Sequence, residues 1–170
     1  MKMNRKIIVI GSPGSGKSTF ARKLHAKTGI PLFHLDLLYH RPDRTVVSRE
    51  AFDAKLRILM AQSEWIIDGN YLRTLPVHLM HCNEVFLFCL PVECCLEGAR
   101  ARLGRSRPDM PWAETELDPE FAGMIRNFPT EQLPVIERLL DRYRDSRQVT
   151  VFHSRAEADA LLAGTAREDS

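Results

Sequence analysis

Short runs of apolar residues recur along the whole chain and indicate β-strands. The runs at 6–10, 85–90 and 149–152 are continuous and do not alternate apolar with polar positions, which is typical of strands covered on both faces. Two shorter runs, at 32–35 and 65–68, complete the set. The pattern therefore predicts five strands, spread from the start of the chain to near its end.

Helical patterns separate these strands. Phe20 and Leu24 lie four residues apart, and the helix that they predict is expected to end at Gly29. Ser48 is the expected N-cap of the next helix, because its hydroxyl can accept a hydrogen bond from a free backbone N–H group. The predicted helices cover residues 17–28, 49–62, 135–144 and 155–163, with two more after the fourth strand and after Asp118.

Strands and helices alternate from end to end, which predicts a parallel sheet joined by right-handed crossovers. The expected fold class is α/β, with three layers and a five-stranded parallel sheet in the middle. No internal repeat or long linker divides the sequence, so we expect a single domain over residues 1–170. Residues 104–120 contain three prolines and many charges, and we expect them to form a short lid.

The composition is that of a globular protein and excludes several classes of function. Hydrophobic residues make up 44% and charged residues 27% of the chain. A net charge of +2 is too small for general attraction to nucleic acid, so direct DNA binding is not expected. No apolar run approaches the roughly 18 residues of a membrane span, and the first eleven residues fit a strand better than a secretory signal. These features predict a cytoplasmic protein, either a monomer or a homodimer.

The cysteines are expected to be reduced thiols that act as small apolar residues. Their spacing fits neither a zinc site nor a redox pair, since no two of them form a C-x-x-C motif. The four positions are Cys82, Cys89, Cys94 and Cys95.

The strongest functional signal is "GSPGSGKS" at 11–18, which satisfies the phosphate-loop pattern G-x-x-x-x-G-K-[ST] between a predicted strand and a predicted helix. The glycines let backbone N–H groups approach phosphate oxygens, and the start of the helix adds its dipole. Lys17 supplies a cation for the phosphates, and the Ser18 hydroxyl can bind Mg²⁺. A turn that only joined strand to helix would leave the lysine unexplained. The predicted ATP-binding residues are Gly11, Ser12, Pro13, Gly14, Ser15, Gly16, Lys17, Ser18 and Thr19.

Two carboxylates follow predicted strands at the sheet edge where ligands of open α/β sheets bind. These residues are Asp36 and Asp68. Each can hold Mg²⁺ through water or accept a proton from an acceptor hydroxyl; the alternative is that each caps the next turn or helix. Gly69 would let a ligand approach the backbone closely, and Asn70 and Tyr71 offer polar contacts.

An arginine cluster precedes and enters the predicted lid. Arginines on a lid can close over a triphosphate and neutralise the charge that develops during transfer. The alternative is a solvated basic face, or pairing with Glu97 and Asp109. The cluster consists of Arg100, Arg102, Arg105 and Arg107.

Histidine and tryptophan carry weaker signals. A packed or solvent-facing role for His34 and His40 is favoured over a catalytic one. Trp112 either stacks on a ring of the ligand or anchors the lid to the core.

The ordered set of segments resembles the small bacterial P-loop proteins known as DNA topology modulation proteins, and it covers nearly the whole chain. The segments are "GSPGSGKST", "HLDLLYHRP", "WIIDGNY", "LPVECCLEGARAR", "RSRPDM" and "DPEFAGMIRNFP". The resemblance implies an adenylate-kinase-like P-loop fold with a short lid, ATP at residues 11–19, and Asp36 near the metal or the acceptor. It also implies phosphate contacts from Arg102, Arg105 and Arg107.

The chain departs from that family's pattern in the expected acceptor and lid regions. His40 stands where an aromatic residue is common, Arg44 lies near the position of a common tryptophan, and "PWAETE" replaces a Gly-Cys pair before the glutamate. The family's name suggests DNA, but the sequence has no helix-turn-helix signal and no basic stripe with interleaved aromatics.

We therefore predict an ATP-dependent kinase of the nucleoside-monophosphate-kinase type, acting on a small-molecule acceptor. Lys17, Asp36, Arg102, Arg105 and Arg107 are the expected catalytic residues, and Mg²⁺ is expected at Ser18 and, through water, at Asp36. The predicted acceptor site consists of Asp36, Tyr39, Asp68, Gly69 and Arg100.

Two alternatives remain open. One is a nucleotide-dependent regulatory ATPase, linked to DNA topology, that closes its lid and signals through a partner with little phosphoryl transfer. The other is a nucleic-acid-associated ATPase, which the modest net charge disfavours.

Overall fold

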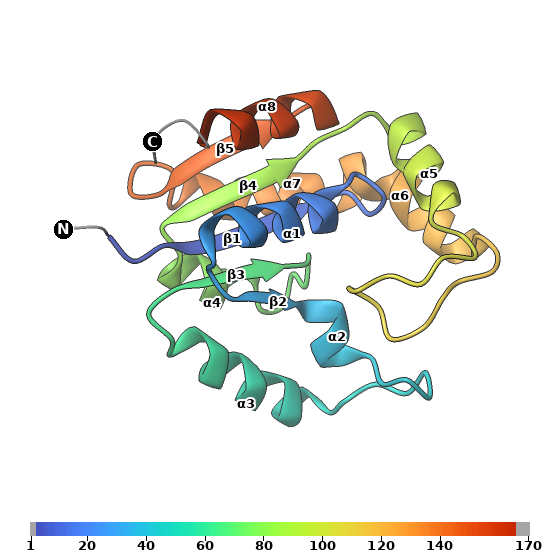
Figure 1. The fold of residues 1–170 in the computed structure, drawn as a ribbon, viewed down its shortest axis with the longest axis horizontal. Coiled ribbons are helices and arrows are strands. Elements are labelled where there is room, and N and C mark those ends of the chain that lie inside the picture. Colours follow the sequence, from blue (N-terminus) through green and yellow to red (C-terminus); the bar gives the residue numbers. More distant parts are fainter. Residues whose placement is uncertain (1–2, 166–170) are drawn as a thin grey trace.

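The computed structural model describes residues 3–165, and Figure 1 shows one sheet with helices packed on its two faces. All five strands run parallel, in the order β2-β3-β1-β4-β5. The fold class is α/β, as predicted. The strands are β1 (Lys6–Gly11), β2 (Leu32–His34), β3 (Trp65–Asp68), β4 (Glu84–Phe88) and β5 (Gln148–Phe152).

Eight helices cover the sheet within residues 3–165. They are α1 (Lys17–Thr28), α2 (Leu35–Tyr39), α3 (Arg49–Met60), α4 (Leu75–His81), α5 (Val92–Ala101), α6 (Pro119–Glu131), α7 (Leu133–Asp141) and α8 (Arg155–Thr165). None of these described helices is both long enough and apolar enough to cross a membrane.

The central strand β1 shows why its sequence is continuously apolar. Ile7 and Val9 belong to a core shared with α1, α5 and α8 on one face of the sheet. Ile8 and Ile10 belong to a second core shared with α3, α4 and α7 on the other face. All four side chains are buried, because successive residues of a strand point to opposite faces and both faces are covered.

The predicted helix ends are confirmed where a capping residue marks them. The Ser48 hydroxyl accepts a hydrogen bond of 3.1 Å from the Ala51 backbone N–H group and starts α3. Asp118 caps α6 in the same way, with Pro119 in the first turn. Gly29 ends α1 in the left-handed conformation that glycine adopts most readily.

Several segments differ from the sequence prediction, and the short helix α2 is one that was not predicted. β2 ends at His34, so Asp36 lies in the first turn of α2 and does not close the strand. β4 ends at Phe88, two residues earlier than predicted. The short helix α4 was not predicted, although Leu75 and Leu79 lie four residues apart on its buried face.

The segment between α5 and α6, yellow in Figure 1, contains turns but neither helix nor strand, and it reaches toward α2. The Gly104 backbone N–H group donates to the Glu114 carbonyl oxygen at 2.6 Å and closes the loop on itself. The Trp112 ring lies 5.4 Å from the His40 ring, and the Arg44 guanidinium lies 5.2 Å from the Trp112 ring. Trp112 therefore joins this loop to the segment after α2.

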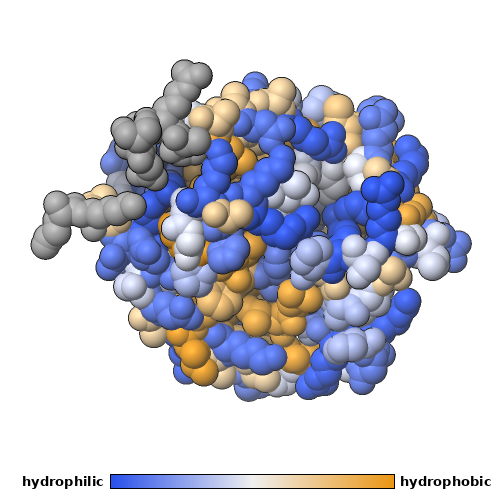
Figure 2. All heavy atoms as spheres, in the orientation of Figure 1, coloured by the Kyte–Doolittle hydropathy of each residue, from blue (hydrophilic) through white to orange (hydrophobic). Residues whose placement is uncertain are grey.

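Figure 2 shows hydrophilic side chains over most of this face of the molecule. Hydrophobic side chains gather over its lower part, between β2 and α3. The upper and right-hand parts of the face, where the phosphate loop and the α5–α6 loop approach each other, are mainly polar (Figures 1 and 2).

His78 on α4 makes the stability of the fold depend on pH. Its side chain is buried, its Nε2 atom has no hydrogen-bond partner, and burial together with the charge of His81 lowers the pKa of His78 to about 4. The unfolded chain binds this proton near pH 6.5 and the folded chain does not. The free energy of unfolding is therefore expected to fall by about 2 to 3 kcal/mol from this residue between pH 6.5 and 4.5.

Thermal or urea unfolding at pH 7 and at pH 4.5 checks this prediction. The drop in the free energy of unfolding between pH 7 and pH 4.5 should be smaller in His78→Leu by most of the His78 contribution. In His153→Asn, at an exposed position, the drop should equal that of the wild type. Equal pH dependence in the wild type and in His78→Leu would contradict the prediction.

Candidate nucleotide and acceptor site

The loop between β1 and α1 has the backbone shape of a phosphate-binding nest. Gly11, Gly14 and Gly16 have φ values of 146°, 79° and 94°, which side-chain-bearing residues rarely adopt. Ser15 is buried, and its hydroxyl has no hydrogen-bond partner. The loop ends at the first turn of α1, whose free N–H groups and dipole favour an anion.

Asn70, just after β3, fixes the start of this loop. The Gly11 N–H group donates to Asn70 Oδ1 at 2.8 Å, and the Asn70 amide donates to the Gly11 carbonyl oxygen. Backbone pairing between β1 and β3 stops at Val9 and Asp68, so the side-chain amide takes the place of the next ladder step. Asn70 was predicted only as a polar contact, and both polar atoms of its side chain are engaged with Gly11.

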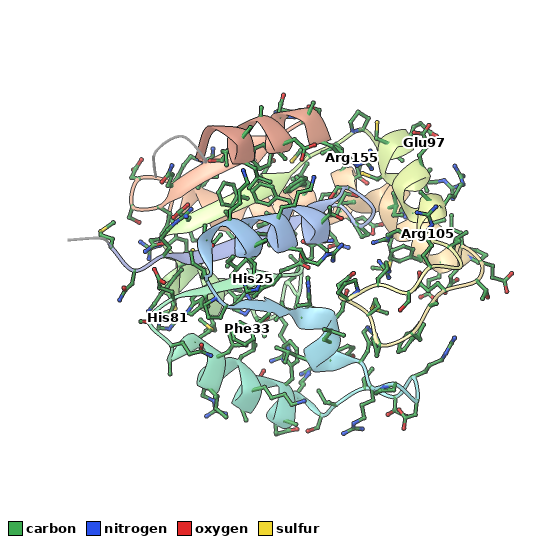
Figure 3. The ribbon with its side chains drawn as sticks, in the orientation of Figure 1. His25, Phe33, His81, Glu97, Arg105 and Arg155 are labelled. Carbon is green, nitrogen blue, oxygen red and sulfur yellow. The ribbon has the colours of Figure 1, made fainter. Side chains whose placement is uncertain are left out.

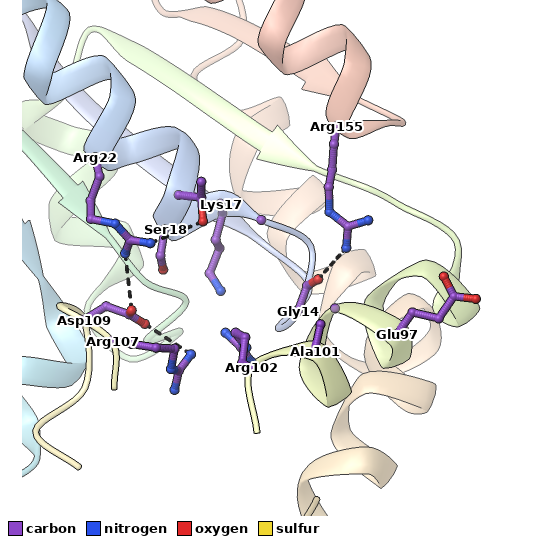
Figure 4. A pocket seen from close by; sticks show the side chains of 13 residues that line it. Gly14, Lys17, Ser18, Arg22, Glu97, Ala101, Arg102, Arg107, Asp109 and Arg155 are labelled. Atoms are coloured by element: carbon purple, nitrogen blue, oxygen red, sulfur yellow. Dashed lines mark hydrogen bonds and ion pairs between the residues drawn. The ribbon is translucent and has the colours of Figure 1, made fainter. Parts of the chain in front are cut away.

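Helices α5 and α8 hold the middle of the loop. A Cβ atom on Gly98 of α5 would overlap the Gly14 carbonyl oxygen, so α5 can approach the loop closely only with glycine there. Arg155, at the start of α8, donates to the Gly14 carbonyl at 2.9 Å and to the Cys94 carbonyl at 3.0 Å. Figure 4 shows Arg155 reaching toward Gly14 from α8.

Asp68 lies at the Ser18 hydroxyl, within the predicted phosphate site. Ser18 Oγ donates to Asp68 Oδ2 at 2.6 Å, and His34 Nδ1 lies 2.7 Å from the same oxygen. Burial alone would raise the pKa of Asp68, but the hydrogen bond from His34, the charge of Lys17 and the Ser18 hydroxyl together lower it. Asp68 is therefore ionised at neutral pH, and its other oxygen, Oδ1, is buried without a partner.

A cavity of about 350 Å³ lies in front of the phosphate loop and is lined by Lys17, Arg102 and Arg107. The Nε atom of Arg102 is buried without a hydrogen-bond partner. Burial and then the charge of Arg107 lower the pKa of Arg102. Bound anionic groups would relieve this crowding of positive charge.

Asp109 links the α5–α6 loop to α1 at the edge of this cavity. Its buried carboxylate lies 3.3 Å from Arg22 Nη1 and 3.4 Å from Arg107 Nη1, as the dashed lines in Figure 4 indicate. The pairing of Arg107 with Asp109 was the alternative to phosphate contact in the sequence prediction, and Arg22 was not singled out. The structure places Arg107 both in the ion pair and on the cavity wall.

The remaining predicted arginines lie elsewhere. Arg105 is exposed on the α5–α6 loop (Figure 3), and Arg100 is exposed on α5. Neither belongs to the lining of the cavity in front of the phosphate loop. The structure thus brings Arg102 and Arg107 to Lys17 and leaves Arg100 and Arg105 outside.

A second cavity, of about 360 Å³, lies between α2, α3 and the β3–α4 connection. Tyr39, Phe52 and Tyr71 line it, with ring centroids 5.4 to 5.9 Å apart. The Tyr71 hydroxyl donates to Asp36 Oδ1 at 2.7 Å. Burial and the Asp36 charge raise the pKa of Tyr71, so this hydroxyl stays protonated. Asp36 therefore stands beside the second cavity, whereas Asp68 stands at Ser18.

Gly69 meets a packing requirement that the sequence did not reveal. Its φ is 144°, and a Cβ atom there would lie 2.9 Å from the Leu35 Cβ atom. Glycine at this position is thus explained by the approach of α2 to the end of β3.

The site fits a magnesium ion that arrives with a nucleotide. No described residues form a cluster of three or more His, Cys, Asp or Glu side chains that could hold a metal on their own. Mg²⁺ usually keeps several waters and uses one or two protein oxygens together with substrate phosphates. The Ser18 hydroxyl and the unpartnered Oδ1 of Asp68 meet that requirement.

Comparisons with known proteins bear on the fold. No protein-family model and no curated protein matches the sequence. A shikimate kinase from Acinetobacter baumannii, solved in complex with shikimate, matches the structure with a TM-score of 0.58 and 16% identity over 97% of this chain and 93% of its own. A gluconokinase from Sinorhizobium meliloti 1021 matches with a TM-score of 0.54 and 16% identity over 98% and 94%. The chain has the fold of small P-loop kinases.

Proposed function

We propose that this protein transfers the γ-phosphoryl group of ATP to a small-molecule acceptor held beside Asp36. One observation carries the proposal: Lys17, Arg102 and Arg107 face a single cavity at the phosphate loop, and the buried Nε atom of Arg102 has no partner. A buried guanidinium N–H group without a partner is costly unless a ligand accepts its hydrogen bond. A polyphosphate supplies both the charge and the acceptor atoms.

The loop amides and Lys17 would bind the β- and γ-phosphates of ATP. Ser18 and Asp68 would hold Mg²⁺, which would supply positive charge that neutralises the phosphates. This arrangement gives the predicted metal role of Asp36 to Asp68. Arg102 and Arg107 would stabilise the charge that moves onto the transferred group and the leaving oxygen.

Asp36 would act as the general base. As the acceptor oxygen forms its bond to the γ-phosphorus, its proton passes to the Asp36 carboxylate, the bond to the bridging oxygen breaks, and ADP leaves. The Tyr71 hydroxyl holds one oxygen of Asp36. The acceptor would occupy the second cavity, whose lining includes the predicted acceptor residue Tyr39.

The fold of the neighbours supports a kinase but does not fix the acceptor. Gluconokinase and shikimate kinase share this fold, and their names identify different hydroxyl-bearing acids as acceptors. The alternative is a nucleotide-dependent regulator, in which ATP closes the lid with little transfer.

The test is ADP release from MgATP across a panel that includes gluconate, shikimate and all nucleoside monophosphates. The wild type should release ADP many times faster with one acceptor than with none, and Asp36→Asn should lose this increase while still binding ATP. A regulator would bind ATP and show no acceptor-dependent release. Failure of every acceptor together with intact ATP binding would therefore count against the kinase and favour the alternative.

A further inference from the structure

Histidine 34 is paired with Asp68 by the register of the sheet. β2 and β3 run parallel, and the last ladder step places the Cα atoms of His34 and Asp68 opposite each other. The His34 ring is 8% exposed and Asp68 is 4% exposed. Their contact, 2.7 Å from Nδ1 to Oδ2, therefore lies at the sheet edge under the phosphate loop and away from solvent.

Both hydrogen bonds to Asp68 reach the same oxygen. Oδ2 accepts from the Ser18 hydroxyl at 2.6 Å and from His34, while Oδ1 has no partner although it is buried. Because an ionised carboxylate can only accept, His34 Nδ1 carries the hydrogen of this contact. Two donors that reach Oδ2 from α1 and from β2 restrict rotation of the carboxylate about its Cβ–Cγ bond.

The unpartnered lone pairs of Oδ1 explain why that orientation matters. A buried carboxylate oxygen without a partner carries a desolvation cost, and a metal-bound water would remove it. Loss of a side chain that orients a metal ligand typically costs about 10- to 100-fold in metal affinity. The Ser18 hydroxyl can donate one hydrogen bond to Asp68 while its own lone pairs face a metal. Because a single hydrogen bond does not fix the plane of the carboxylate, a second donor is needed.

We infer that His34 is a positioning residue, which fixes Asp68 so that Oδ1 is presented to the hydration shell of the nucleotide-bound magnesium ion. The inference rests on the proposed nucleotide site but adds a residue that neither touches nucleotide nor takes part in transfer. The increase in nucleotide affinity that Mg²⁺ produces would therefore depend on the buried side chain of His34.

Calorimetric binding of ADP with and without Mg²⁺ tests the assignment without any turnover. The wild type should bind ADP more tightly when Mg²⁺ is present. His34→Leu should lose about tenfold or more of this magnesium-dependent gain and keep its affinity for ADP alone within about twofold. His34→Asn should retain most of the gain, since its amide N–H can stand near the position of Nδ1.

Two further variants separate positioning from damage to the fold. His34→Gln is polar and of similar size but places its amide beyond the Nδ1 position, so it should lose the gain as the leucine variant does. His78→Leu also replaces a buried histidine, far from the phosphate loop in the chain, and should keep the wild-type gain. The contrast between asparagine and glutamine decides the matter if the leucine variant does not fold.

Three results would overturn the inference: a full gain in His34→Leu or His34→Gln, an asparagine variant as deficient as glutamine, or weakened binding of magnesium-free ADP in each His34 variant. If the wild type bound ADP under neither condition, the proposed function itself would fail. The two failures are therefore distinguishable.

Discussion

Substituting Lys17 with alanine is expected to lower turnover by about a hundredfold or more. The Lys17 amine lines the cavity at the phosphate loop, and its charge acts on Asp68. It meets negative charge that grows on the phosphates during transfer, so its loss affects the transition state more than the bound ground state. The measurement is the rate of ADP release at saturating MgATP with the acceptor that the panel identifies.

Lys23→Ala provides the matched control. Lys23 lies on the same helix, and its amine pairs with Asp159 at 3.0 Å, with both side chains more than half exposed. Such a surface pair contributes little to stability, so this variant should keep wild-type turnover. Turnover in Lys17→Ala equal to that of Lys23→Ala would contradict the proposed mechanism.

Replacing Gly98 with alanine is expected to reduce kcat/KM for MgATP by roughly a hundredfold. The new methyl group would overlap the Gly14 carbonyl oxygen and lie 2.7 Å from the Arg155 guanidinium. Backbone atoms cannot rotate away as a flexible side chain can, so α5 or the phosphate loop must shift. Displacements of about 1 Å at a site of this kind cost on the order of a hundredfold in rate.

Gly123→Ala makes the same chemical change in a helix without the overlap. Nothing lies within 4 Å of a Cβ atom at Gly123 in α6, and alanine is the better helix former by roughly 1 kcal/mol. This variant should be as active as the wild type and slightly more stable to heat. Wild-type kinetics in Gly98→Ala would show that α5 does not hold the loop.

Local sequence patterns predicted the fold because they act over a few residues. The continuous apolar residues of β1, the Ser48 and Asp118 caps and the left-handed Gly29 each report the conformation of their own segment. Helix α4 escaped prediction because its seven residues span only about two turns, too few for a recurring apolar stripe. Proline in its first turn was the signal that could have revealed it.

The site was predictable only where one segment contains it. The phosphate loop is a continuous stretch, so Lys17 and Ser18 follow from the sequence. The register of β2 against β3 decides that Asp68 and not Asp36 lies at Ser18 and that His34 reaches Asp68, and no local pattern encodes that register. Arg22 and Asp109 meet across 87 positions of chain, which explains why sequence patterns did not single out Arg22.

The contacts that hold the phosphate loop in shape have a consequence for how the protein would recognise nucleotide. Strand β3, through Asn70, and the helices α5 and α8, through Gly98 and Arg155, impose the loop's curvature from outside. A glycine-rich loop without such contacts would lose conformational entropy when it binds its ligand. In this protein the loop loses that entropy when the chain folds. Affinity for nucleotide should therefore depend on how firmly α5 and α8 are packed: conditions that loosen either helix should weaken recognition before the sheet itself melts.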